Sequence, residues 1–467
     1  MREFTSWHTV AALSWLEAVL EERFGQRFLL RIGHDSTLVV SRQGEPGEIT
    51  LALDGATFAR ADSDLPCAHW DGRIEGWSTV AAGKLPAPGA ASFGAPLIRS
   101  TKCGYHIGYD VLGLVYWMLS RQEEVGRTDL DSHGRFPAVS SHAFKHGYLE
   151  RPIVDEWFHV LGLVMRRVWP ELELSKHAFS VRLSHDVDIP SLYGFKPWSM
   201  IGRMMAGDLL KRHDVRSCIK APVIKLGTRL VLHAADPYNT FDWIMDHAET
   251  HSLQNAFYFI CGRTDPQRDA DYEPEHPAIR QLMRRIHARG HEIGLHPSYN
   301  SYRDARVISG EAERLRRIAR EEGISQPQWG GRMHYLRWQQ PVTLRGWAEA
   351  GMDYDSTLGY ADRPGFRCGS CFEYPAFDPV AGEMLALRIR PLIAMECTVI
   401  EPMYLGLGLG ERARDKFNEL KSACARVDGC FTLLWHNSSL NASALRDLYT
   451  TVADTDFSDR VPDSKRS

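Results

Sequence analysis

Short apolar runs alternate with longer stretches of helical periodicity from Phe179 onward. The short runs predict strands at FSVRLSHDVD, NAFYFICG, HEIGLH, QWGGR, residues 394–400 and CFTLLWH. The longer stretches predict helices over residues 240–251, 277–289, 304–322, 341–350, 411–427 and 443–453. Such alternation is typical of an α/β fold, in which helices cover a parallel sheet that is either open or closed into a barrel.

The first part of the chain follows a different pattern. Residues 1–25 predict an amphipathic helix interrupted by acidic residues, not a signal peptide. Strand-like runs follow at residues 27–32, 36–41 and 48–53, then a Gly- and Pro-rich loop at 81–96 and helices around 110–124 and 154–168. We therefore expect an α+β accessory domain over residues 1–175, an α/β domain over 176–455, and a polar tail at 456–467.

One segment, residues 190–235, interrupts the alternation. It has a helical pattern, contains several methionines, and carries eight Lys and Arg residues against only Asp208 and Asp214. It is either a solvated helical cap or a lid that faces an anionic substrate, such as a nucleotide-linked or lipid-pyrophosphate-linked sugar.

Composition and charge narrow the possible partners. The 467-residue chain has 55 basic and 59 acidic residues and a net charge of -4, so no global basic field indicates nucleic-acid binding. It contains no run of about 18 apolar residues, so we expect no transmembrane segment. Its nine cysteines are scattered and odd in number, which favours a reducing, cytoplasmic compartment.

Two clusters of possible metal ligands stand where predicted strands end. Asp186 and Asp188 in SHDVD are two residues apart and share one face of a strand. His296 ends the strand of GHEIGLH. Taken alone, the aspartates fit capping residues of a loop equally well, and a single His at a strand end is more often structural. Together, Asp and His are the ligand types expected for zinc or a similar divalent metal.

Two further clusters provide candidates for positioning and proton transfer. Arg332, His334 and Tyr335 follow the paired glycines of WGGRMHYLRW, and Arg332 is a natural partner for a buried carboxylate. His436 ends the apolar strand of FTLLWHNSS, a placement that suits a general acid. Surface arginines or a buried structural His would explain each cluster taken alone.

Taken together, the four clusters resemble the motifs of the polysaccharide deacetylase superfamily, carbohydrate esterase family 4, over residues 179–453. The resemblance implies a distorted (β/α) barrel in which Asp186 is the catalytic base and Arg332 orients it. It also implies that Asp188 and His296 bind a divalent metal, most simply Zn²⁺ with Co²⁺ or Mn²⁺ as alternatives, and that His436 is the acid. His334 and Tyr335 are expected at the substrate, where the backbone near Tyr335 can stabilise the oxyanion.

The chain departs from the family pattern at one metal ligand. In the family a second His follows GHEIG-x-H four residues later, but here Asn300 stands at that position. Its amide oxygen is a poorer zinc ligand than imidazole. Asn300 can serve as the ligand, His334 or His185 can replace it, a water can fill the position, or the site has lost its metal.

The resemblance therefore implies a metal-dependent amide hydrolase that removes an N-acetyl or similar acyl group from an amino sugar. A nucleotide-linked sugar, a lipid-linked sugar and a small glycoside of surface polysaccharide or secondary metabolite biosynthesis all fit as substrates. The alternative is a catalytically impaired protein that keeps the fold as a sugar-binding or scaffold module, which the substitution at Asn300 supports.

Overall fold

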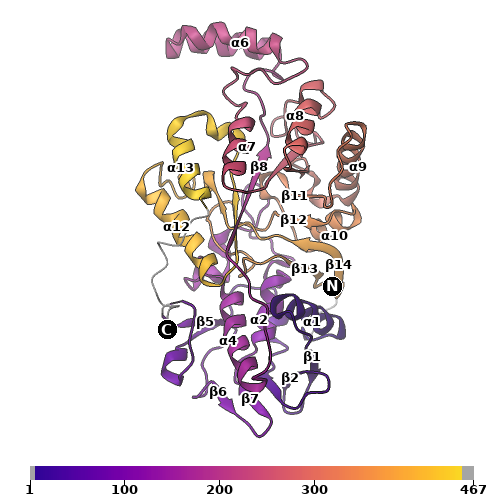
Figure 1. Ribbon diagram of the computed structural model, residues 1–467, viewed down its shortest axis with the longest axis vertical. Coiled ribbons are helices and arrows are strands. Elements are labelled where there is room, and N and C mark those ends of the chain that lie inside the picture. Colours follow the sequence, from indigo (N-terminus) through magenta and orange to yellow (C-terminus); the bar gives the residue numbers. More distant parts are fainter. Residues whose placement is uncertain (1–5, 82, 455–467) are drawn as a thin grey trace.

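The computed structural model of the protein describes residues 6–81 and 83–454 (Figure 1). The polar tail expected at 456–467 lies outside these residues. None of the helices in the described ranges combines the length and the apolar character needed to cross a bilayer. All nine cysteines are free thiols. The cytoplasmic location stays a prediction.

A nine-stranded sheet forms the centre of the larger part of the molecule. In spatial order its strands are β13 (Tyr374–Asp378), β14 (Glu383–Ile389), β12 (Tyr354–Asp355), β11 (Gly330–Gly331), β10 (Glu292–His296), β9 (Asn255–Ile260), β8 (Ser180–Val187), β16 (Cys430–Leu434) and β15 (Ala394–Met395). Neighbouring strands pair in parallel, except β13 with β14. Within the described residues no pairing joins the edges β13 and β15. The mixed α/β class is confirmed, whereas closure into a barrel stays a prediction.

Helices that alternate with the strands along the chain pack around this sheet (Figure 1). They are α7 (Phe241–Thr250), α8 (Pro277–Ala288), α9 (Ala305–Glu321), α10 (Val342–Glu349), α11 (Glu396–Ile400), α12 (Glu411–Arg426) and α13 (Ser443–Ala453). In α8 the buried side chains recur three or four residues apart, at Ile279, Leu282, Met283 and Ile286, which gives the helix one apolar face toward the sheet.

The prediction of a strand over residues 394–400 is wrong for most of that range. Only Ala394 and Met395 form β15, and the chain then turns into the short helix α11. An apolar run this short does not distinguish strand from helix by periodicity. The turn matters because it sets Glu396 at the carboxyl end of β15.

Residues 6–81 and 83–170 form a second group of strands and helices. One sheet has the order β1 (Leu29–Ile32), β2 (Thr37–Ser41), β3 (Glu48–Ala52), β7 (Gly104–Ile107) and β6 (Ile98–Ser100), and β4 (Cys67–Trp70) pairs separately with β5 (Leu85–Pro88). The helices are α1 (Val10–Phe24), α2 (Val111–Leu119), α3 (His142–Lys145) and α4 (Ile153–Val168). β5 lies inside the loop expected at 81–96. The sequence did not predict this strand because every second residue of it is a proline, which is unusual within a strand.

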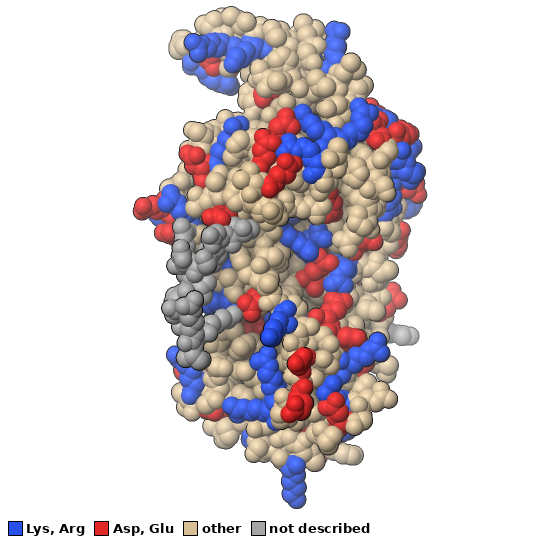
Figure 2. Space-filling model, in the orientation of Figure 1, with Lys and Arg blue, Asp and Glu red and all other residues tan. Residues whose placement is uncertain are grey.

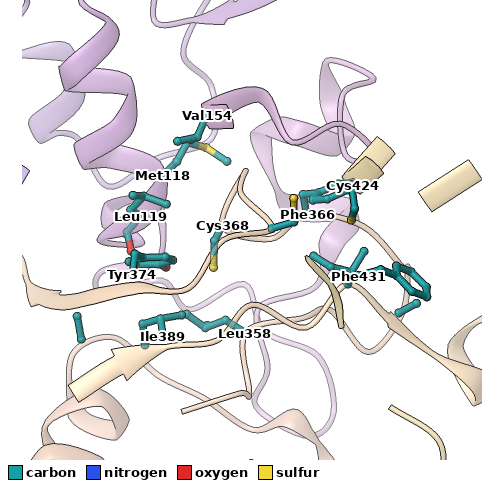
Figure 3. Packing of buried hydrophobic residues seen from close by; sticks show 14 of the residues in the cluster. Met118, Leu119, Val154, Leu358, Phe366, Cys368, Tyr374, Ile389, Cys424 and Phe431 are labelled. Carbon is teal, nitrogen blue, oxygen red and sulfur yellow. The ribbon is translucent and has the colours of Figure 1, made fainter. Parts of the chain in front are cut away.

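The two parts share one hydrophobic core. Trp15 of α1 stacks on Phe377 of β13 at 4.9 Å between ring centroids, and its Nε1 donates to the Pro375 carbonyl at 2.8 Å. Figure 3 shows Leu119 of α2 packed beside Tyr374 of β13, whose hydroxyl donates to the Leu119 carbonyl at 3.0 Å. The boundary expected near residue 175 stays a prediction, but no polar layer separates the two sides of this packing.

The segment at 190–235 forms two helices, α5 (Trp198–Gly207) and α6 (Val215–Gly227), joined by a π-helical turn (Asp208–Arg212). In Figure 1, α6 lies at the upper end of the molecule, beyond the helices that cover the sheet. Its inner face packs Ala221 and Ile224 against Ile201 and Tyr193 in a small cluster of its own.

Candidate active site

The predicted site residues gather where parallel strands end. Six of them line one cavity of about 670 Å³, namely Asp186, Asp188, His296, His334, Tyr335 and His436. They lie at or just after the carboxyl ends of β8, β10, β11 and β16, which meet at the same edge of the sheet. A cavity of this size is in the range that binds small molecules.

Asp186 is held by a buried guanidinium. Arg332 Nη1 donates to Asp186 Oδ1 at 2.9 Å, and Nη2 donates to the Ser184 hydroxyl at 2.9 Å. Arg332 is fully buried, so its charge needs this carboxylate nearby. The arginine reaches the site because β11 lies close to β10: a Cβ on Gly331 would stand 1.8 Å from the Leu295 carbonyl oxygen. The predicted pairing of Arg332 with Asp186 is thus present.

The geometry of Asp188, His296 and His334 fits a metal ion. The outer nitrogen of each ring contacts a backbone carbonyl, His296 Nδ1 that of Arg332 at 2.6 Å and His334 Nε2 that of Arg268 at 3.0 Å. Carbonyl oxygens only accept hydrogen bonds, so these nitrogens carry hydrogen and the inner nitrogens of neutral rings present lone pairs.

Those inner nitrogens lie 3.0 Å apart, and Asp188 Oδ1 is 3.3 Å from His296 Nε2 and 3.6 Å from His334 Nδ1. Asp188 Oδ1 is buried without a hydrogen-bond partner. Two facing lone pairs and a buried carboxylate oxygen repel one another unless a cation lies among them. One oxygen and two imidazole nitrogens, each ring fixed by a carbonyl, form a donor set suited to zinc.

The pKa values of the three side chains in this cluster shift in different directions. Burial opposes a charge on His296, but Asp186 and Asp188 outweigh it and raise the pKa of His296. Burial, together with the neighbouring His296, lowers the pKa of His334 despite Asp188. Burial opposes the charge on Asp188, yet the surrounding imidazoles, His334 first, hold its pKa well below the usual range. The cluster therefore favours positive charge at its centre.

His436 is paired with an acid that the sequence did not reveal. Glu396 Oε1 lies 2.7 Å from His436 Nδ1 and accepts the His436 backbone N–H at 2.9 Å. Burial acts against the charged ring, but Glu396, followed by Asp188 and Asp186, raises the pKa of His436 to about 10. His436 Nε2 remains directed toward the cavity, 3.6 Å from Asp188 Oδ2. The only sequence signal for Glu396 was a single acid within the apolar run LIAMECTVI.

Asn300 and His185 are not in the cluster of Asp188, His296 and His334. The exposed Asn300 accepts a hydrogen bond at Oδ1 from Arg337 Nη1 at 3.0 Å and donates from Nδ2 to the Thr264 carbonyl at 3.2 Å. His185 points to the other face of β8, with Nδ1 2.7 Å from the Trp435 carbonyl, because successive strand residues alternate. His334 lies beside Asp188 and His296 instead, and the identity of the third ligand stays a prediction.

A loop from the first part of the chain completes the cavity wall. Arg135 lines the cavity, donates from Nη1 to the Tyr335 carbonyl at 2.9 Å, and is held through Nε by Asp131 at 2.7 Å. Next to it, the His133 carbonyl accepts from Arg337 Nε at 2.7 Å. Tyr335 itself has φ = 60°, a left-handed conformation that a non-glycine residue adopts only where its surroundings enforce it. No local pattern predicted these contacts.

Comparisons with known proteins reach different parts of the chain. Residues 45–170 match a model described as a family of unknown function, DUF7033. No curated protein matches the sequence.

Solved structures resemble 59–61% of the chain. A Mycobacterium smegmatis protein described as a polysaccharide deacetylase has 18% identity and a TM-score of 0.37 over 60% of this chain and 86% of its own. A Pseudomonas aeruginosa PAO1 protein with the same description has 16% identity and a TM-score of 0.34 over 61% and 85%. The allantoinase Puue has 13% identity and a TM-score of 0.34 over 59% and 83%. Because these TM-scores are low, the α/β class is assigned from the strand order and not from these structures. Any function has to be inferred from the residues of the site.

Proposed function

We propose that this protein is a metal-dependent hydrolase that removes an N-acetyl or similar acyl group from an amino sugar. One observation carries the proposal: a buried Asp–Arg pair, an Asp–His–His set and a His–Glu pair converge on one cavity. These are the three parts that amide hydrolysis requires, namely a base, a site for a Lewis acid, and an acid for the leaving amine. The amino-sugar class comes from the resemblance of the motifs.

Asp188, His296 and His334 would hold the metal. When bound, a zinc ion or similar metal would supply a water of lowered pKa and polarise the acyl carbonyl. Cys397 lies next to Glu396 and His436, but burial and the neighbouring Glu396 raise the pKa of its thiol, which disfavours a second metal site there.

The side chains divide the two proton transfers between them. Asp186 accepts a proton from the attacking water, and Arg332 keeps this carboxylate ionised and oriented. His436 donates a proton to the departing amine nitrogen, and Glu396 keeps the ring charged until that step. Tyr335 contributes to the substrate wall, and the backbone around it is placed to stabilise negative charge on the acyl oxygen.

Cations at the cavity favour a substrate with an anionic group. Arg135, Lys196 and Arg268 all line it, although each already contacts a carbonyl or a carboxylate. Arginine is suited to phosphate and carboxylate groups. We therefore propose a nucleotide-linked or lipid-linked amino sugar as the substrate, with its anionic group at these cations, although Asp269 and Asp271 also line the cavity.

The competing hypothesis is a sugar-binding or scaffold protein without turnover. The substitution at Asn300 no longer supports it, because His334 supplies the imidazole that Asn300 lacks. A binding module also has no need of a buried base and a separately charged acid on either side of one cavity.

The test is release of free acid from a panel of N-acylated amino sugars, free and nucleotide-linked, by metal-loaded protein. Asp186→Asn is the inactive control, because it removes the base and keeps the side-chain volume. Acid released by wild type and not by Asp186→Asn would support the proposal. Binding of a panel member with equal affinity by both proteins, and release by neither, would establish the scaffold hypothesis instead.

A further inference from the structure

The helix α6 has a second apolar face that nothing in the described structure covers. Val215, Ile219, Val223 and Leu226 follow one another at spacings of four, four and three residues, so they form one stripe along the helix. Each of them is between 52% and 63% exposed. The opposite face is already used, since Ala221 and Ile224 pack inward. A helix with two apolar faces is built to be buried on both.

The neighbouring turns extend this surface. Leu209, Leu210, Leu230 and Val231 are 47% to 72% exposed, and Trp198 at the start of α5 is 53% exposed. Large aliphatic side chains gathered in this way are rare on a free protein surface and mark a binding site.

Basic residues border the stripe. Arg216 and Lys220 each follow a stripe residue directly, so they stand along one edge of it. Among the described residues, neither forms an ion pair, nor do Arg203, Lys211 and Arg229 nearby. Residues 190–235 hold eight Lys and Arg and two Asp, a formal charge of +6 in a chain of net charge -4. Figure 2 shows Lys and Arg side chains gathered on the projecting arm at the top of the molecule, where Figure 1 places α6.

We propose that residues 190–235 dock the protein on the surface of an anionic lipid bilayer. An apolar stripe edged with cations on a projecting helix is the pattern of an element that lies in the interface of a membrane, with aliphatic side chains among the acyl chains and cations at the headgroups. Nucleic acid offers no apolar surface for four aliphatic side chains, and a second copy of the chain would have to place like charges together.

The docking segment is continuous with the active site. Lys196 and Met200, from the start of this segment, line the same cavity as Asp186 and His436. A protein docked through α6 would therefore hold the cavity next to the bilayer, within reach of an amino sugar linked to a membrane lipid. This choice of substrate rests on the proposed function, whereas the docking does not.

The test is flotation of the full chain with lipid vesicles. The vesicles contain either phosphatidylcholine alone or phosphatidylcholine with about 30 mol% phosphatidylglycerol, an anionic lipid of the kind that attracts basic segments. We expect binding to the anionic vesicles alone, weakened by high salt. The variant Ile219→Ser/Val223→Ser should bind on the order of tenfold more weakly. The variant Arg216→Ala/Lys220→Ala should bind roughly 25-fold more weakly, from about fivefold for each cation.

Matched controls separate this surface from ordinary exposed residues. Ile74→Ser removes an isolated exposed aliphatic side chain, and Arg99→Ala/Lys102→Ala removes two exposed cations of the first part; both should bind like wild type. Equal binding to both kinds of vesicle, no binding to either, or a dimer that Ile219→Ser/Val223→Ser converts to monomer would overturn the proposal. The assay needs no turnover, so failure to bind counts against docking, and failure to release acid counts against the proposed hydrolase.

Discussion

Replacing Glu396 with Gln should shift the basic limb of the activity profile toward lower pH. In the proposed function His436 donates a proton, so activity should require its charged form and be lost as the pH rises through its pKa. That pKa is raised to about 10, and Glu396, 2.7 Å away and buried, is the main group that raises it. Losing an opposite charge at this distance lowers a pKa by roughly one to three units.

The magnitude follows from that shift. Near pH 6 the variant should remain close to wild type, since His436 is charged in both. At pH values above the pKa of His436 in wild type, the rate of wild type should exceed that of Glu396→Gln by about 10- to 1,000-fold, one factor of ten for each unit by which the pKa falls. Gln keeps the volume of Glu, so metal content and the thermal unfolding midpoint report whether the site has stayed intact.

The assay is kcat/KM from pH 5.5 to 10.5 on the amino sugar that releases acid, with an NMR titration of the His436 ring as a readout that needs no substrate. Glu292→Gln is the control, because Glu292 is also a largely buried carboxyl on the sheet but contacts Tyr354 at the far end of β10. A limb that stays in place in Glu396→Gln, or that moves equally in Glu292→Gln, would refute the role of Glu396.

Further tests separate the other roles. Asp186→Asn should lower kcat by about 10²- to 10⁴-fold and retain the metal, whereas Asp188→Asn should lose metal and activity together, as measured by elemental analysis. His334→Ala should deplete the metal, but Asn300→His should leave metal affinity nearly unchanged; tighter binding in the latter would return Asn300 to the ligand set. Exhaustive chelation should abolish acid release, and added Zn²⁺, Co²⁺ or Mn²⁺ should restore it; full activity without detectable metal would disprove the metal mechanism. Arg135→Met should raise KM for a phosphate-bearing substrate by about tenfold or more. Loss of its hydrogen bond to the Tyr335 carbonyl should lower kcat on that substrate and on an uncharged glycoside alike, so steady-state kinetics on both substrates separates the two effects.

The sequence predicts the elements whose pattern is local. Amphipathic helices such as α8 and the apolar strands β8, β9, β10 and β16 have enough residues for their periodicity to be distinct. Asp186, His296, Arg332 and His436 could be grouped because each lies at or just after the carboxyl end of a strand, and parallel strands end at one edge. β12 and β11 are only two residues long, and β13 contains a proline, so their pairing depends on neighbours and not on their own residues.

The missed parts of the site depend on contacts between distant residues. Arg135 meets Tyr335 across 200 positions of sequence, and Glu396 meets His436 across 40. Whether His334 or Asn300 faces the cluster depends on contacts made by other residues. Arg337 binds the amide oxygen of Asn300, and the Arg268 carbonyl contacts the outer nitrogen of His334, so that the inner nitrogen faces His296. Patterns of residue types carry no information about such competition.

The loop at residues 131–135 has a consequence for how this protein can change over evolutionary time. Arg135 and His133 hold the backbone of Tyr335 and the side chain of Arg337, so part of the cavity wall depends on a segment far upstream. Substitutions on either side of this contact should be inherited in pairs, and recombination that joins the first part of one homologue to the second part of another should break the site even when both halves fold. Homologues that keep this site should therefore carry both parts of the chain together.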